Sequence, residues 1–360
     1  MPRMLSPVRL TGATTLRDGE MQDRSVVIEN GRISKGPHPA VDLRGHYIMP
    51  GIIDLHGASL RHALRQGVDA VSAMRGTDRA LAAQGVTTAW QMLDWATADH
   101  GPDTILGVLD LLDRYRPDAL TDLRLQVCYD PVLPGAILPG AGSGLLSALH
   151  AYGLDLVLFP AQMDEARELT PQVVRHLCEL AEQFDALGVS YGTLGDKTAE
   201  RRERFAMIGA RLSALPANRR PAAAAFAMGD PVVLSAQDIL AGTYLQGNIP
   251  VSHLIRDRMT RALVSANAPA APVRAAFDLV RSKSMGLPQA WDMVSAHPAQ
   301  ILRLSDRGVI DYGKRADLVV IHRETLQVEA TICGGALTYL SKQAAPRFSV
   351  IQEPFRLAAE

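Results

Sequence analysis

The feature that most constrains the fold is a long alternation of apolar and helix-like segments between residues 50 and 304. Between most of the apolar segments the hydrophobic residues recur at helical spacing, as they do over residues 71–85 and 171–187. The second of these helices has Pro171 near its start and Gly188 just past its end, where helix boundaries favour them. Eight apolar segments have the length and composition of buried strands: residues 52–57, 86–93, 123–130, 154–162, 188–196, 210–216, 231–236 and 262–268.

Strands that alternate with helices in this way over about 250 residues predict an α/β fold of the (β/α)8 TIM-barrel type. A doubly wound open sheet is the alternative. No G-x-G-x-x-G motif follows the first strand, so the dinucleotide-binding form of that sheet is disfavoured. In a TIM barrel the chemistry takes place at the carboxyl ends of the strands. The residues at the strand ends are therefore the candidates for a functional site.

Both ends of the chain are rich in predicted strands rather than helices. Asn30-Gly31 lies between two apolar runs, which is the strongest short signal for a β-hairpin. Residues 307–340 again alternate apolar and polar positions, broken by Gly, Lys and Arg. We therefore predict a small composite β-sandwich domain built from residues 1–49 and 305–360, and a barrel over residues 50–304.

The composition is that of an ordinary globular protein. Hydrophobic residues make up 47% of the chain, charged residues 21%, and the formal net charge is −1. The three cysteines are odd in number and widely spaced, which indicates neither a disulfide framework nor a zinc knuckle. The N-terminus lacks the apolar run of a signal peptide and no segment has the length of a membrane span, so we expect a cytoplasmic protein that does not enter a membrane.

The most basic segment of the chain does not predict nucleic-acid binding. Within residues 196–205, Arg201, Arg202 and Arg204 are interleaved with Glu200 and Glu203. Opposite charges three or four residues apart on a helix are typical of a solvated face. No aromatic residues are interleaved with a basic stripe, so nucleic acid is not an expected partner.

A β-rich N-terminus, then "IMPGIIDLHG" (48–57), a barrel, and the closing stretch "SAHPAQILRLSDRGVIDYGKRADLVVIH" (295–322) resemble the amidohydrolase superfamily. Within the superfamily three stretches resemble the triphosphate diphosphohydrolases of phosphonate utilisation: "PGIIDLHGASLRHALRQGVD" (50–69), "ALAAQGVTTAWQML" (80–93) and "ALVSANAPAAPVRAAFDLV" (262–280). It covers nearly the whole chain and is weakest in the middle strands. The resemblance implies a hydrolase that cleaves a triphosphate with water activated by a divalent metal (Zn, Mn or Fe), and a possible homodimer.

The metal ligands that this resemblance implies are mostly replaced. The first strand retains His56, but Ala58 stands where a second ligand is expected, and a methyl group cannot bind a metal. The fourth strand ends at residues 159–161 (Phe-Pro-Ala) instead of a lysine or glutamate, and the fifth and sixth strands contain no histidine. After the eighth strand Asn267 takes the expected place of the catalytic aspartate, and an uncharged amide cannot act as a general base.

Several polar residues at the strand ends could still line a pocket. For the acids, capping of a helix N-terminus is an alternative role. His56 could bind a single divalent metal or a substrate, or form hydrogen bonds in a polar pocket. The candidate pocket residues are His56, Asp94, Asp130, Asp196, Lys197 and Asn267.

Three functions therefore remain open. The first is a metal-dependent hydrolase of the phosphonate branch with an unusual site. The second is a barrel of the same descent that binds no metal and instead recognises a small phosphorylated or anionic ligand, or a partner protein. The third is a metal-free enzyme with other chemistry. Metal content of the purified protein distinguishes the first from the other two.

Overall fold

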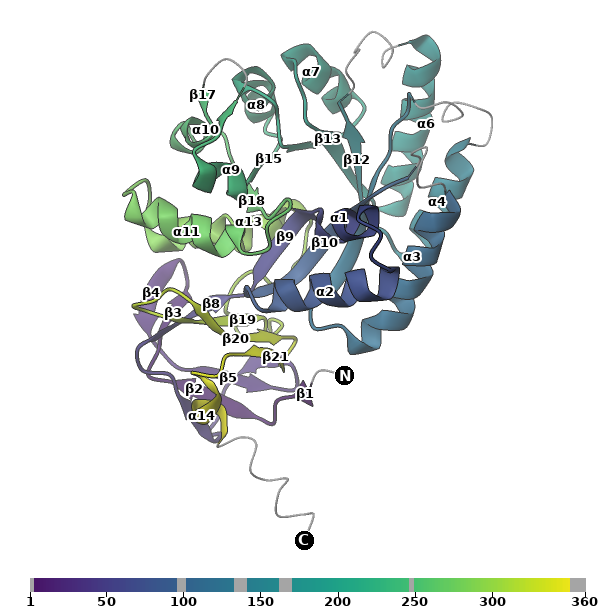
Figure 1. The fold of residues 1–360 in the computed structure, drawn as a ribbon. Coiled ribbons are helices and arrows are strands. Elements are labelled where there is room, and N and C mark those ends of the chain that lie inside the picture. Colours follow the sequence, from purple (N-terminus) through teal and green to yellow (C-terminus); the bar gives the residue numbers. More distant parts are fainter. Residues whose placement is uncertain (1–2, 96–101, 133–140, 162–169, 246–248, 350–360) are drawn as a thin grey trace.

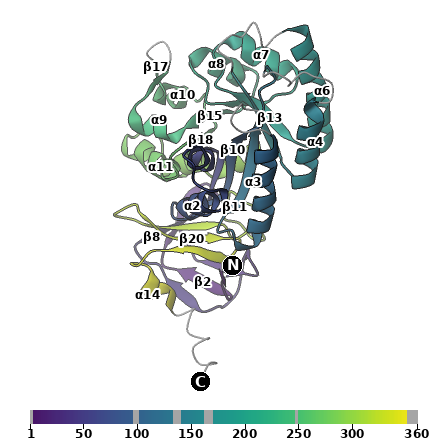
Figure 2. The same ribbon diagram turned by 45° about the vertical axis from the view of Figure 1, so that its right-hand side comes forward.

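The computed structural model of the protein describes residues 3–95, 102–132, 141–161, 170–245 and 249–349 (Figure 1). The described residues form a barrel of parallel strands surrounded by helices and a separate β-domain that contacts one end of the barrel. Figures 1 and 2 both show α2 and α11 of the barrel facing the β-domain. Among the described residues, no helix combines the length and the apolar character needed to cross a bilayer.

The barrel consists of eight parallel strands in the order β18-β15-β14-β13-β12-β11-β10-β9. A bridge between Gly57 and Ala266 brings the last strand back to the first. The predicted TIM-like barrel is thus confirmed, and each of the eight predicted apolar segments overlaps one of its strands. The barrel strands are β9 (Ile52–Gly57), β10 (Val86–Asp94), β11 (Asp122–Cys128), β12 (Leu156–Pro160), β13 (Ser190–Leu194), β14 (Leu212–Ala214), β15 (Val232–Ser235) and β18 (Ala262–Val264).

Helices follow the strands around the outside of the barrel. The predicted boundaries of α6 are confirmed: Thr170 caps its N-terminus by accepting from the backbone of Val173, and Gly188 ends it with φ of +71°. The helices are α1 (Ser59–Arg65), α2 (Ala70–Ala82), α3 (Pro102–Tyr115), the short 3-10 helix η1 (Arg116–Asp118), α4 (Ala141–Tyr152), α6 (Pro171–Leu187), α7 (Ala199–Met207), α8 (Arg219–Ala227), α9 (Ala236–Ala241), α10 (Ser252–Arg256), α11 (Ala271–Arg281), α12 (Leu287–Asp292) and α13 (Ala296–Ile301). Two short strands, β16 (Tyr244–Leu245) and β17 (Ile249–Pro250), pair with each other beside α10.

Two apolar layers follow from the alternation of side chains along the strands. One layer includes Phe159 and lies between the sheet and the helices, where it packs with Phe184 of α6. The other contains Trp90, Leu158 and Val264 and fills the barrel interior. The barrel is therefore a packed core, and a ligand can reach it only from its ends.

The β-domain combines strands from both ends of the chain, as predicted, within the described residues. A seven-stranded sheet has the order β1-β21-β20-β19-β8-β3-β4, and a four-stranded sheet has the order β6-β5-β2-β7. Buried side chains of both sheets share one cluster, which includes Leu10 and Val320. The strands are β1 (Arg3–Met4), β2 (Val8–Thr11), β3 (Thr14–Arg17), β4 (Glu20–Asp23), β5 (Val26–Glu29), β6 (Arg32–Ser34), β7 (Ala40–Asp42), β8 (His46–Pro50), β19 (Leu318–His322), β20 (Val328–Cys333) and β21 (Ala336–Leu340), followed by α14 (Ala345–Phe348).

The predicted hairpin in this domain is also confirmed. Asn30 and Gly31 join β5 to β6 with φ of +50° and +75°, the left-handed backbone that a two-residue hairpin turn needs. Residues 350–360 of the predicted domain lie outside the described residues. The exact limits of the two domains remain a prediction.

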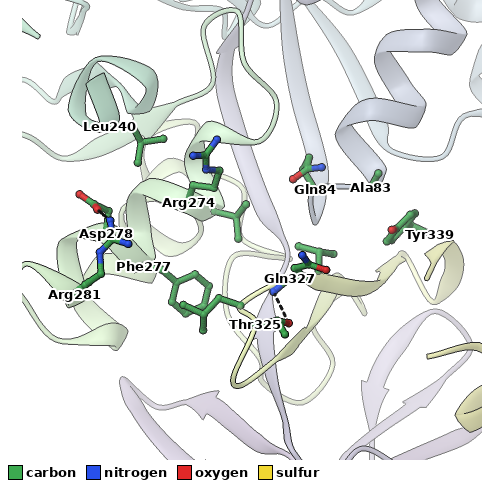
Figure 3. Close-up of a pocket in the computed structure, with 13 residues that line it drawn as sticks. Ala83, Gln84, Leu240, Arg274, Phe277, Asp278, Arg281, Thr325, Gln327 and Tyr339 are labelled. Atoms are coloured by element: carbon green, nitrogen blue, oxygen red, sulfur yellow. Dashed lines mark hydrogen bonds and ion pairs between the residues drawn. The ribbon is translucent and has the colours of Figure 1, made fainter. Parts of the chain in front are cut away.

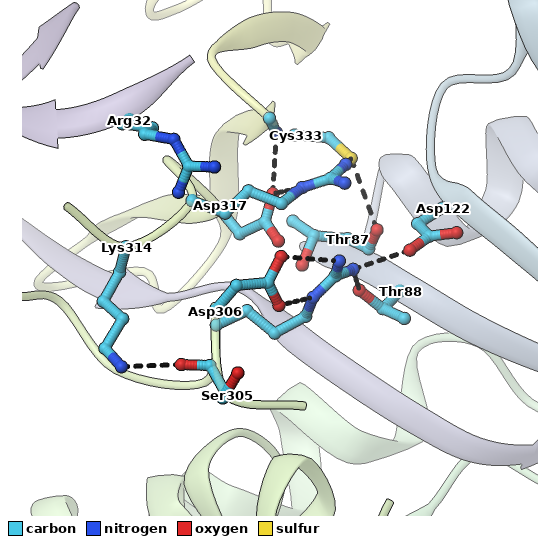
Figure 4. Close-up of polar contacts among 12 residues, drawn as sticks. Arg32, Thr87, Thr88, Asp122, Ser305, Asp306, Lys314, Asp317 and Cys333 are labelled. Atoms are coloured by element: carbon cyan, nitrogen blue, oxygen red, sulfur yellow. Dashed lines mark hydrogen bonds and ion pairs between the residues drawn. The ribbon is translucent and has the colours of Figure 1, made fainter. Parts of the chain in front are cut away.

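Ion pairs join the β-domain to the amino ends of the barrel strands (Figure 4). The guanidinium of Arg307 donates to Thr88 Oγ1 at 2.8 Å and to Asp122 Oδ2 at 2.6 Å, and it also pairs with Asp306. Because the β-domain is attached at this end, the carboxyl ends of the strands point away from it. We call that opposite end the barrel mouth.

Candidate functional site at the barrel mouth

The end of β9 lies in a tightly packed part of the mouth. A Cβ atom at Gly57 would lie 2.0 Å from Nε2 of Gln91, so only glycine fits there. Ala58 comes next, and its backbone N–H donates to the carbonyl of Ala266 at 2.6 Å, across the seam that closes the barrel. The methyl group of Ala58 is buried. The position at which a second metal ligand was expected is therefore inside the mouth but offers no donor atom.

His56 is held as a neutral ring. The side-chain amide of Gln126 donates from Nε2 to Nδ1 of His56 over 2.7 Å, so the ring proton lies on Nε2. Burial, reinforced by the charge of Arg61, lowers the pKa of His56 to about 4. A metal ligand needs a free nitrogen lone pair. In this arrangement one ring nitrogen carries the proton and the other already accepts a hydrogen bond.

Apolar side chains meet where the ligands of a metal would converge. Ala58 of the mouth, Met92 of β10 and Cys128 of β11 form one buried cluster, and Leu194 of β13 packs against it. We call these four residues the mouth cluster. Burial raises the pKa of the Cys128 thiol to about 12, so it remains protonated and is a poor ligand and nucleophile near neutral pH. Cys128 therefore acts as a small buried apolar side chain in this cluster.

Two of the candidate acids have partners near the strand ends. Asp94, the last residue of β10, accepts from Arg61 at 3.1 Å and from Arg65 at 2.8 Å. Asp130 accepts from the backbone N–H of Val132 at 3.0 Å, which stabilises the turn after β11. Asp94 thus belongs to a small charged group in which two guanidinium groups share one carboxylate.

Asp196 is completely buried and belongs to a different group of contacts. It pairs with Arg201 and accepts from Thr193 Oγ1 at 2.5 Å. It does not cap α7, because that role falls to Thr198. Lys197 is half-buried, and its carbonyl accepts from the side chain of Asn218 at 2.6 Å. Asp196 thus contacts Arg201 and Thr193, whereas His56 is hydrogen-bonded to Gln126.

The predicted solvated face of α7 is wrong for two of its three arginines. Arg201 and Arg202 are 0% exposed, and only Arg204 is exposed. Nη2 of Arg201 donates to the carbonyls of Phe159 at 3.3 Å and Pro160 at 3.1 Å, at the end of β12. These long-range acceptors explain the burial of Arg201, because a guanidinium that is hydrogen-bonded and paired can leave water.

Arg202 connects α7 to the neighbouring strands. It donates to Thr193 Oγ1 at 2.6 Å and to the carbonyl of Leu212 at 3.2 Å, and it lies 3.5 Å from Asp230. Burial lowers the pKa of Arg202, while the carboxylates of Asp196 and Asp230 raise it. An arginine stays charged under these conditions. The paired charges fix α7 and the turn before it onto β12, β13 and β14.

Asn267 is exposed and lies beyond the end of β18. Ala262 and Val264 of β18 belong to the inner apolar layer. Ala266 bridges to Gly57 of β9, but its φ of +51° ends the extended backbone, so the alternation of the strand does not continue to Asn267. The assignment of Asn267 to the place of the catalytic aspartate remains a prediction.

Two residues of the site could not be selected from the sequence. Asp54 accepts from the backbone N–H of Ser265 at 2.9 Å and from its hydroxyl, and so ties β9 to β18. Burial raises the pKa of Asp54, and these hydrogen bonds lower it. Gln126 is the partner of His56, and its Oε1 is buried with no hydrogen-bond partner among the described residues. Its position two residues before Cys128, on the same face of β11, is the one signal that pointed to the mouth.

The described residues do not fit a divalent metal. Within the described ranges, no three His, Cys, Asp or Glu side chains lie close enough together to hold one. Nδ1 of His56 is hydrogen-bonded to Gln126, and Asp94 is engaged by two arginines. Asp164, an acid beyond the fourth strand, lies outside the described residues. The chemistry of the mouth is therefore that of apolar contacts, a neutral imidazole and a pair of guanidinium groups.

The fold and the sequence together define the class of this protein. The chain belongs to the amidohydrolase family, whose model matches residues 145–339. Among curated proteins it is similar to alpha-D-ribose 1-methylphosphonate 5-triphosphate diphosphatase of Escherichia coli (strain K12). The two are 26% identical over 352 residues, a match that covers 85% of this chain and 93% of that enzyme.

Solved structures show the same architecture at low sequence identity. A dihydropyrimidinase from Brevibacillus agri has a TM-score of 0.69 at 12% identity, with 93% of this chain and 95% of that chain covered. An N-acetylglucosamine-6-phosphate deacetylase from Pasteurella multocida also has a TM-score of 0.69 at 12% identity, with 92% of this chain and 99% of that chain covered. These similarities establish the fold alone.

Proposed function

We propose that this protein is a metal-free relative of the phosphonate-pathway diphosphatases that binds a phosphorylated sugar at the barrel mouth without hydrolysing it. The observation that carries the proposal is the mouth cluster of Ala58, Met92, Cys128 and Leu194. Apolar side chains stand where metal-bound water would have to form, and a metal is what lowers the pKa of such water to about 7.

The ligand class is supported by charge and by similarity. Arg61 and Arg65 share the single carboxylate of Asp94, which leaves one positive charge in excess beside the mouth. Guanidinium groups bind phosphate oxygens in a bidentate manner. The substrate named for the Escherichia coli relative is a ribose triphosphate, so a sugar phosphate of that kind is the ligand that we propose.

Metal analysis combined with calorimetry tests this function. Protein produced with added Zn, Mn and Fe is expected to contain less than about 0.1 equivalent of any of them, since the ligand set is incomplete. Titration with alpha-D-ribose 1-methylphosphonate 5-triphosphate is expected to give saturable binding and no release of diphosphate. Replacing Arg65 by glutamine is expected to weaken that binding about 10-fold, the scale of one charged hydrogen bond.

Metal-dependent hydrolysis is the second candidate function, because family membership and the 26% identical relative favour it. One equivalent of metal that is lost in the His56→Ala variant, together with diphosphate release, would establish hydrolysis and overturn our proposal. An absence of both binding and turnover would reject the phosphorylated-sugar ligand. A homodimer and a cytoplasmic location remain predictions; size-exclusion chromatography with light scattering checks the former.

A further inference from the structure

A groove of about 560 Å³ lies between the barrel and the β-domain, far from the barrel mouth (Figure 3). One wall is α11, and the other is the turn of residues 325–328 with Tyr339 of β21. Ala83 and Gln84, which lie between α2 and β10, also line it. The groove is therefore at the amino ends of the barrel strands, opposite to the mouth, and it has the size of a small-molecule site.

One face of α11 supplies the charge of the groove. Four lining residues of α11 lie at positions i, i+3, i+4 and i+7 of the helix, which places them in one stripe: Arg274, Phe277, Asp278 and Arg281. Asp278 pairs with Arg281. The guanidinium of Arg274 is exposed and makes no hydrogen bond or ion pair with the described residues. The stripe thus carries one excess positive charge, located at Arg274.

The remaining lining provides an apolar surface and polar groups. Phe277 and Leu240 are partly buried and pack against the main core on one side, while the groove touches them on the other. Gln84 and Gln327 contribute amide groups that donate and accept hydrogen bonds. Figure 3 shows Asp278 and Arg281 on one side of the groove and Gln84, Gln327 and Tyr339 on the other.

We propose that this groove binds a small phosphorylated molecule with a flat ring, such as a nucleoside diphosphate. An unpaired guanidinium is suited to a phosphate group, because it offers a rigid fork of donors. An aromatic side chain such as Phe277 attracts a planar base by stacking, which is worth more than its apolar area alone. Because α11 belongs to the barrel and residues 325–328 to the β-domain, the ligand contacts both domains. This site is separate from the one proposed at the mouth.

Calorimetry of the full chain with ADP, adenosine and inorganic diphosphate at constant ionic strength tests the proposal. ADP is expected to bind at one site, and adenosine and diphosphate each at least about 10-fold more weakly, because each lacks one half of the recognised groups. Arg274→Gln is expected to weaken ADP binding about 10-fold by removing one charged contact. Arg175→Gln, an exposed change on α6, is the matched control and leaves binding unchanged.

A second variant separates the groove from the mouth. Arg65→Gln is expected to leave ADP binding intact, because Arg65 is beside Asp94 at the opposite end of the barrel. The proposal is overturned if ADP does not saturate at millimolar concentration, if Arg274→Gln binds ADP as the unmodified chain does, or if Arg65→Gln abolishes the binding. Circular dichroism of each variant confirms that the fold is retained.

Discussion

Replacing Arg201 by methionine is expected to lower the free energy of unfolding by about 3–5 kcal/mol, the cost of leaving a buried charge without its partner. The side chain is fully buried, and its guanidinium pairs with Asp196, which is also fully buried. Methionine fills much of the same volume but supplies no charge and no donors. Asp196 and the carbonyls of Phe159 and Pro160 would then lose their shared partner without gaining water. Denaturation in urea at pH 7, followed by circular dichroism, measures the loss.

Arg204→Met on the same helix is the matched control. Arg204 is exposed, so its replacement is expected to change stability by no more than about 0.5 kcal/mol. The double variant Asp196→Asn/Arg201→Met is expected to lose less free energy of unfolding than the two single variants lose together. The difference is expected to be about 1 kcal/mol or more, because both substitutions act on one ion pair. A loss below about 1 kcal/mol in Arg201→Met would show that the pair contributes little beyond its packing.

Features fixed by local chemistry could be predicted from the sequence. Pro171 and Gly188 predict the two ends of the helix of residues 171–187, and Asn30-Gly31 predicts the hairpin turn. The strands of the barrel could also be predicted, because a continuous apolar run indicates a strand buried on both faces even when its neighbours are unknown. The barrel and the participation of both chain ends in one β-domain follow from such local signals.

The burial of Arg201 and Arg202 could not be predicted in this way. A pattern of alternating charges on one helix looks the same whether it faces water or a set of buried acceptors. The acceptors of Arg201 are carbonyls that lie 41 and 42 residues earlier in the chain. Only the packing of α7 against the end of β12 shows that this pattern belongs to the interior.

The candidate site was predictable in what it lacks and not in what replaces it. The absence of a donor at Ala58 is visible in the sequence, but Met92, Cys128 and Leu194 look like ordinary strand residues until the strands are placed side by side. Asn267 is exposed beyond the end of β18, and its assignment to the place of the catalytic aspartate remains a prediction. In a strand a shift of one residue exchanges the two faces, so a short motif at a strand end locates a site better than it assigns the residues of that site.

Protonation of His56 is expected to destabilise the protein as the pH falls from about 6.5 to about 4. The pKa of His56 is lowered from 6.5 to about 4 by burial and by the charge of Arg61. In this interval the unfolded chain binds a proton at His56 and the folded chain does not, so acid favours unfolding. The stabilising contribution is complete above about pH 6.5 and is lost towards pH 4. The shift corresponds to about 3 kcal/mol.

Comparison with His56→Gln isolates this effect, because carboxylates such as Asp54 titrate in both proteins and their contribution cancels. The free energy of unfolding of the unmodified chain, relative to that of His56→Gln, is expected to fall by about 3 kcal/mol between pH 7 and pH 4. Nuclear magnetic resonance of the imidazole nitrogens should show a neutral ring protonated at Nε2, as the hydrogen bond from Gln126 requires. A titration midpoint above pH 6 would contradict the lowered pKa, and a proton on Nδ1 would leave Nε2 free to bind a metal. Only the apolar side chains of the mouth cluster would then stand against a metal at the barrel mouth.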